Sequence, residues 1–203
     1  MPAPVDDLEA KTFMRTRTGP NQPSRWTLPV VVFALLANAS ATADQPAAHG
    51  LHTEFLMTLH APLDPESQIS DSLAIANVRP TGGWVQGPRL KGVLVPPGGD
   101  WSRVMPSGVL RLDVRLTIKA DDGALIYVTY NGVERDLPVG EQKIQQDQHV
   151  IGPDDVKVWM IAPTFETSAA KYAWLNETQA VGKMVQYKDG PSGYVNYEIY
   201  AVR

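Results

Sequence analysis

The amino-acid sequence predicts an all-β protein, built as a single small antiparallel β-barrel of about seven or eight strands. Glycine and proline recur at short intervals, and the stretches between them alternate polar and apolar residues, as strands with one buried face do. No long stretch shows the 3.6-residue apolar period of an amphipathic helix. A sheet of this size can close on itself, which removes its exposed edges.

The clearest strand covers residues 109–119, where VLRLDVRLTIK alternates strictly. The sequence Asp121-Asp122-Gly123 then predicts a hairpin turn to a partner strand over residues 124–130. Further strands are predicted over residues 52–59, 81–95, 156–165, 172–178 and 194–202, the second of them bent by its glycines. Residues 63–80 are expected to be irregular, residues 96–100 and 131–132 to form turns, and residues 133–153 to form a loop with room for a short helix.

The first 43 residues have the pattern of a secretory signal peptide. Three arginines precede a short apolar run over residues 28–37, and small residues follow it. That run is about half of the ~20 residues that a membrane span needs. The acidic residues within 1–13 indicate that Met14 is the true start, with 1–13 an upstream extension; an amphipathic or buried N-terminal helix is the alternative. We therefore expect an exported protein, periplasmic or secreted, whose mature part, residues 44–203, is one barrel domain without a membrane span.

Composition excludes several kinds of site. The net charge of -4 offers no basic surplus for nucleic acid. Without cysteine there are no disulfides, thiolate metal sites or cysteine nucleophiles. The sequence has no metal-binding histidine motif, phosphate-binding loop or dinucleotide fingerprint, so no metal and no cofactor are expected. Its four histidines are scattered: His49, His52, His60 and His149.

The hairpin of residues 109–130 carries candidate catalytic groups. Asp113 and Arg115 share the polar face of its first strand, which is either a solvated outer face or the lining of a ligand-binding interior. A three-residue turn with Gly123 in the left-handed conformation pairs Thr117 with Tyr127, and so adds Tyr127 to that face. A two-residue turn offers Tyr130 instead.

A second cluster of candidates lies at residues 165–176. Within the strand expected there, Tyr172, Trp174 and Asn176 would alternate onto one face and stack on a substrate, or the aromatic rings would pack in the core. Glu166 lies at a strand end, where it is either a proton-transfer group or a solvated turn residue.

Six ordered motifs resemble a known family. They are Thr81-Gly82-Gly83, residues 87–92 (GPRLKG), Gly98-Gly99-Asp100-Trp101, residues 112–115 (LDVR), residues 121–127 (DDGALIY), and Phe165-Glu166-Thr167 with residues 172–176 (YAWLN). Together they resemble the domain of unknown function 3237 over about residues 52–203. The resemblance implies a barrel similar to those of allene oxide cyclases and dirigent proteins, which steer a reactive small molecule inside an apolar cavity. It also favours the inward placement of Asp113, Arg115 and Tyr127, and it is compatible with a homo-oligomer.

The function expected from these features is that of an isomerase, cyclase or lyase that needs no cofactor. Arg115 and Tyr127 would stabilise an enolate or phenolate oxygen, while Asp113 or Glu166 moves the proton. Residues assigned to binding of the aromatic or apolar oxygenated substrate are Tyr172, Trp174, Asn176, Tyr130 and Arg89. Two alternatives remain open: a non-catalytic periplasmic carrier of a hydrophobic small molecule, and a structural protein with a filled barrel.

Overall fold

The computed structural model describes residues 50–146 and 150–203, which belong to one compact unit. The predicted signal peptide, residues 1–43, lies outside the described residues, as does the start of the predicted domain 44–203. Within the described part of the chain, no helix is long and apolar enough to cross a bilayer.

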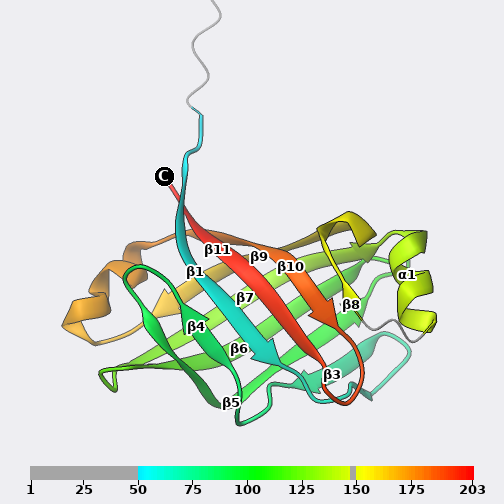
Figure 1. Cartoon of the computed structure of the whole chain (residues 1–203), viewed down its shortest axis with the longest axis horizontal. Helices are drawn as coiled ribbons and strands as arrows, with labels where there is room; N and C mark the ends of the chain where they lie inside the picture. Colours follow the sequence, from blue (N-terminus) through cyan, green and yellow to red (C-terminus); the bar gives the residue numbers. More distant parts are fainter. Residues whose placement is uncertain (1–49, 147–149) are drawn as a thin grey trace, which may run out of the picture. The chain divides into compact units, whose positions relative to one another are not determined.

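The described residues form a closed antiparallel barrel (Figure 1). Its eight strands follow the order β1-β4-β5-β6-β7-β9-β10-β11, and β11 pairs with β1 to close the circle. The strands are β1 (Thr53–Pro62), β4 (Trp84–Gln86), β5 (Lys91–Val104), β6 (Leu110–Ala120), β7 (Leu125–Asp136), β9 (Val156–Glu166), β10 (Ala180–Lys188) and β11 (Tyr194–Val202). The remaining elements are β2 (Ser67–Gln68), β3 (Leu73–Asn77), α1 (Pro138–Gln145), β8 (Val150–Ile151), and the 3-10 helices η1 (Pro153–Asp155) and η2 (Ala170–Glu177).

Side-chain alternation places the apolar face of each long strand inside the barrel. On β6, Leu112, Val114, Leu116 and Ile118 are buried, and the residues between them face outward. On β7, the same period continues through Ile126 and Val128 to Tyr130. The prediction of an all-β antiparallel barrel is therefore confirmed, and its interior is formed by the apolar faces of the strands.

The β6–β7 hairpin has the predicted three-residue turn. Gly123 has a φ of 87°, a left-handed conformation that glycine adopts without steric cost. The amide of Ala120 donates to the carbonyl of Ala124 at 2.8 Å. Thr117 consequently pairs with Tyr127, as predicted.

Two predicted turns are wrong because long-range pairing overrides local turn preference. Residues 96–100 form a bulge inside β5, where the register shifts between Val95 and Gly99. The first part of β5 pairs with β4 and the second part with β3, so the bulge bends one strand across two neighbours. Residues 131–132 continue β7, which extends to Asp136 into the region predicted as a loop.

Other predicted boundaries also require correction. Residues 63–80 contain the short strands β2 and β3, and residues 81–95 form two strands joined by a turn. The strand predicted over residues 172–178 is the 3-10 helix η2. Strand β10 has no counterpart in the prediction.

The two ends of the barrel differ. Helix η2, orange in Figure 1, lies at one end and buries Tyr172 and Leu175 against the core. The Tyr172 hydroxyl donates to Asp122 of the β6–β7 turn at 3.0 Å, which fixes η2 to the hairpin. Helix α1 and the β10–β11 turn lie at the opposite end (Figure 1). Residues of that turn line a cavity.

Candidate functional site

The expected catalytic face of the β6–β7 hairpin points out of the barrel. Asp113 and Arg115 form an ion pair at 3.0 Å in which both side chains are nearly half exposed. Tyr127 is 40% exposed. The prediction that these three side chains line the interior is wrong, because the apolar face of the hairpin occupies it. An ion pair of this exposure contributes little to stability.

The second predicted cluster lies at the end of the barrel that carries η2, and it does not converge on a cavity. Glu166 is exposed and lies opposite Tyr127 in the sheet. The Arg89 guanidinium lies 3.8 Å from the centre of the Trp174 ring. Asn176 accepts a hydrogen bond from the Thr167 amide at 2.8 Å and donates one to its carbonyl at 2.9 Å. Together with the buried Tyr172, these contacts hold η2 in place, and the predicted alternation onto one strand face is wrong.

A cavity lies at the other end of the barrel. Its volume is about 70 Å³. A single buried water needs about 10–15 Å³ of such space. The cavity therefore has room for several waters or for part of a small organic molecule. Tyr130, Trp159, Tyr187 and Tyr197 supply aromatic walls, and among the predicted site residues Tyr130 alone belongs to this lining.

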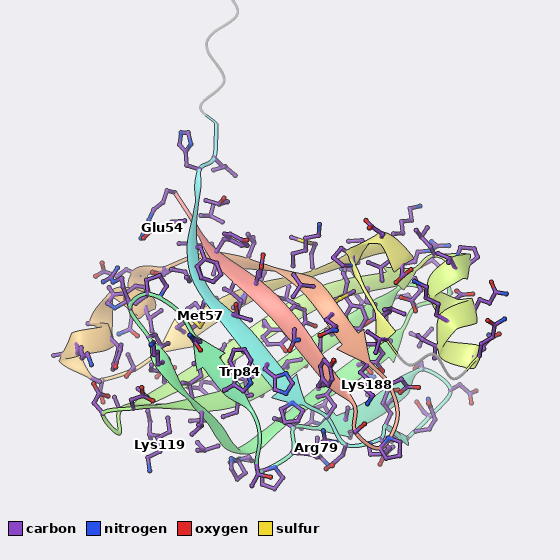
Figure 2. The ribbon with its side chains drawn as sticks, viewed as in Figure 1. Glu54, Met57, Arg79, Trp84, Lys119 and Lys188 are labelled. Atoms are coloured by element: carbon purple, nitrogen blue, oxygen red, sulfur yellow. The ribbon has the colours of Figure 1, made fainter. Side chains whose placement is uncertain are left out.

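The rim of the cavity is held by Arg79. Its guanidinium donates to the carbonyls of Leu63 and Pro191 at 2.9 Å and of Gly193 at 2.8 Å, so it ties the β10–β11 turn to the segment after β1. Figure 2 labels Arg79 and Lys188 near this end, with Lys119 projecting from the hairpin at the other. The rim is thus fixed by charge-assisted hydrogen bonds to the backbone.

Among the carboxyl groups of the cavity, Asp100 has a pKa raised toward neutral pH. It lies after the β5 bulge and lines the cavity. Burial raises its pKa to about 6, and the charges of Glu66 and Asp113 add to the rise, while a 2.9 Å hydrogen bond from the Asp113 backbone amide opposes it. Asp113 therefore contacts Asp100 through its backbone amide, while its own carboxylate lies outside the barrel.

Two more of the carboxyl groups that line the cavity have raised pKa values. Burial raises the pKa of Glu134 well above its usual range, and the charges of Asp136, Glu66 and Asp100 act in the same direction. Burial and the charge of Asp189 also raise the pKa of Glu66 at the rim. Because Asp100 and Glu134 influence each other, protonating one favours ionisation of the other.

Buried phenols provide hydrogen-bond donors beside these acids. Burial, followed by the charge of Asp100, raises the pKa of Tyr130. Burial also raises the pKa of Tyr197, whose hydroxyl accepts a 2.7 Å hydrogen bond from the Trp159 indole N–H. The Tyr197 hydroxyl oxygen is thereby occupied as an acceptor, which leaves its proton for donation. Within residues 50–146 and 150–203, the Tyr130 hydroxyl has no hydrogen-bond partner.

Comparison with known proteins identifies the family. The family model described as "Protein of unknown function (DUF3237)" matches residues 51–202. The chain belongs to the DUF3237 family. The resemblance carried by its sequence motifs is thereby confirmed.

Individual relatives agree with this assignment. A UPF0311 protein of Rhodopseudomonas palustris is 27% identical over 143 residues, which cover 68% of this chain and 91% of the relative. The crystal structure of a conserved protein of unknown function from the same species has a TM-score of 0.65 at 23% identity, covering 76% of this chain and 99% of that one. A beta-barrel like protein from Acinetobacter baumannii has a TM-score of 0.60 at 30% identity, covering 78% and 100%. These likenesses establish the barrel and leave the activity to be argued from the site.

The DUF3237 barrel holds cavity residues that the sequence prediction missed. Asp100 lies within one of the family-like motifs, but its Pro-Pro-Gly-Gly surroundings were interpreted as a turn. Glu134 continues the inward alternation of Tyr130 and Gly132, which was a usable signal. Trp159 and Tyr197 occupy inward positions on correctly predicted strands and were not singled out.

No metal centre accompanies these groups in the described part of the chain: no three His, Asp or Glu side chains there are arranged to hold an ion. The groups that the cavity offers are carboxyls with raised pKa values, neutral phenols and aromatic walls. This set can transfer a proton and stabilise an oxygen that gains negative charge.

Proposed function

We propose that this DUF3237 protein catalyses proton transfer on a small carbonyl compound bound in the cavity, as an isomerase, cyclase or lyase without a cofactor. The observation that supports the proposal most directly is Asp100, whose pKa of about 6 suits a base working near neutral pH. At pH 7 the larger fraction of a group with this pKa is ionised and can accept a proton.

In this mechanism Asp100 removes a proton from a carbon next to the carbonyl group. The C–H electron pair forms the enolate, and Asp100 becomes a neutral acid. Where a neighbouring C=C bond extends the enolate into a dienolate, returning that proton to the far (γ) carbon moves the double bond and completes an isomerisation, so substrate and product have the same atoms and no oxidant is needed.

The phenols are suited to stabilise the enolate oxygen. Tyr130 and Tyr197 are neutral donors whose rings contact edge to face, with centroids 6.0 Å apart. Glu134, whose raised pKa favours its protonated form, offers a third donor. Donors already oriented in a site of low polarity stabilise developing charge more than water does.

Hydrogen–deuterium exchange tests the proposal. Small enolisable ketones are incubated in D₂O with the wild-type protein, Asp100→Asn or Asp113→Asn, and carbon-bound deuterium is followed by NMR. We expect exchange in the wild type, with a rate that rises with pH and is half-maximal near pH 6. Asp100→Asn should lose at least about 100-fold, the usual contribution of a general base.

Asp113→Asn is the matched control, because it removes the same charge from outside the barrel and keeps the amide that contacts Asp100. It should retain most of the wild-type rate, with the pH profile shifted slightly toward lower pH because the charge of Asp113 contributes to the raised pKa of Asp100. Equal exchange in wild type and Asp100→Asn would overturn the proposal. Binding of ketones without exchange would also overturn it and would favour the non-catalytic carrier.

A further inference from the structure

The cavity has an unusual balance of charged side chains. Five carboxyl groups line it, from Asp64, Glu66, Asp100, Glu134 and Asp189, against one amine, that of Lys188. Asp64 and Glu66 lie on the segment after β1 and Asp189 on the β10–β11 turn, at the end of the barrel, so these three surround the mouth. Asp100 and Glu134 lie with the buried phenols further inside.

The carboxyl groups have few compensating contacts. None of the five forms an ion pair with another residue of 50–146 or 150–203. Arg79, which ties the rim segments together, directs its donors to three backbone carbonyls. At the mouth, Asp189 accepts a 3.3 Å hydrogen bond from the Tyr187 hydroxyl. Acidic groups gathered in this way carry a cost that an added cation would remove.

Aromatic rings at the same site favour an organic cation over a metal ion. Tyr187 and Trp159 contact each other with ring centroids 5.1 Å apart, and both belong to the cavity lining. Ring faces attract ammonium groups, and the attraction grows when water is excluded. The mouth therefore combines carboxylates and ring faces, the two groups that bind a protonated amine.

An independent observation indicates what the inner end binds. Tyr130 is only 5% exposed, and its hydroxyl lies in the cavity without a hydrogen-bond partner among the described residues. Because Tyr130 lines the cavity, its hydroxyl is available to a ligand. A neutral phenol next to Asp100 and Tyr197 suits an acceptor oxygen such as a carbonyl.

We propose that the substrate carries a protonated amine at its outer end, held by Glu66, Asp189 and the ring of Tyr187, and a carbonyl oxygen at its inner end, held by Tyr130 and Tyr197. The assignment of the inner end rests on the proposed proton-transfer site, whereas the assignment of the outer end rests on the charges at the mouth. Substrates with a carboxylate, sulfate or phosphate at the outer end are excluded by repulsion.

Three acetophenones with the same ring and ketone test the charge preference. They are 4-(aminomethyl)acetophenone, 4-(hydroxymethyl)acetophenone and 4-acetylbenzoate, whose outer groups are cationic, neutral and anionic. Affinities are measured by isothermal titration calorimetry at pH 7.5. The amine should bind at least about tenfold more tightly than the alcohol, and the benzoate more weakly than both.

Two double variants locate the effect. Glu66→Gln/Asp189→Asn should bring the affinity for the amine close to that for the alcohol and leave the alcohol unchanged. Asp121→Asn/Glu177→Gln removes the same charge from exposed positions at the η2 end of the barrel. This variant should keep the tighter binding of the amine. Equal affinities for amine and alcohol in the wild type, tightest binding of the benzoate, binding of none of the three, or a preference that survives the mouth variant would overturn the proposal.

Asp100→Asn separates this proposal from the proposed function. It leaves the mouth intact, so the preference for the amine should persist while exchange is lost. A preference for the amine without wild-type exchange would refute proton transfer alone. Exchange lost in Asp100→Asn without any preference for the amine would refute the charge assignment alone.

Discussion

Replacing Asp100 with Asn should stabilise the fold at neutral pH. The folded state raises the pKa of this carboxyl from 3.8 to about 6, chiefly through burial. A raised pKa means that the folded protein binds the proton more tightly than the unfolded chain does. The cost of ionising Asp100 is therefore small below pH 4, develops as pH rises from about 4 to 6, and is complete above pH 6.

The magnitude follows from the two pKa values. The rise from 3.8 to about 6 corresponds to about 3 kcal/mol at pH 7.5 and to less than about 1 kcal/mol at pH 4. Asn has nearly the same shape, has no charge to bury, and keeps an oxygen that can accept the Asp113 amide hydrogen bond. We therefore expect Asp100→Asn to raise the free energy of unfolding by up to about 3 kcal/mol at pH 7.5.

Urea denaturation at pH 4 and pH 7.5 measures this effect. The comparison uses the difference between variant and wild type at each pH, because Glu134 and Glu66 titrate in both proteins. Asp113→Asn, which loses a carboxylate from the outer face, should differ little from wild type at either pH. An Asp100→Asn protein less stable than wild type at pH 7.5, or a gain that is the same at both pH values, would refute the reasoning.

Two further substitutions, each paired with a control variant, test the packing of the barrel. Tyr197→Phe removes the acceptor of the Trp159 N–H and should lower the free energy of unfolding by about 1–3 kcal/mol, because a buried donor loses its partner. Tyr130→Phe, which breaks no hydrogen bond between described residues, should lower it much less in the same urea titration, and an equal loss would count against this explanation. Gly132→Ala places a Cβ atom 2.8 Å from Leu112 and 3.0 Å from Ile161. The resulting overpacking should lower the free energy of unfolding by about 1–3 kcal/mol, and with it the melting temperature. Gly152→Ala, where the added atom meets open space, is its control and should leave the melting temperature nearly unchanged.

Strands that alternate polar and apolar residues could be predicted from the sequence because one of their faces meets the core. That condition holds for β6 and β11, and both were predicted. It fails for β10, where the inward residue Gly182 leaves room for Ile161, so no apolar alternation marks the strand. In η2, Tyr172 and Leu175 are buried three residues apart, the period of a 3-10 helix, whereas the aromatic residues at 172 and 174 suggested a strand.

The candidate site was harder to predict because period two does not tell which face of a strand lies inside. On β6 the apolar face fills the interior, so Asp113 and Arg115 lie outside. The polar groups that do reach the cavity are single residues on otherwise apolar faces, such as Glu134, or follow a bulge, as Asp100 does. Their proximity depends on the register of three consecutive strands, in which Asp100 pairs with Val114 and Val114 with Tyr130, and the bulge in β5 shifts that register.

Together, the stability and exchange experiments on Asp100→Asn show whether the buried charge of Asp100 serves proton transfer or another purpose. Burying a carboxylate that destabilises the fold at neutral pH is a cost that a purely structural barrel has no need to carry. A variant that is more stable at pH 7.5 and has lost exchange indicates that the charged state of Asp100 is kept for proton transfer. If the same gain in stability leaves exchange intact, the buried charge serves another purpose. Compensation by a bound cation is then the favoured explanation, and the amine titration distinguishes it directly.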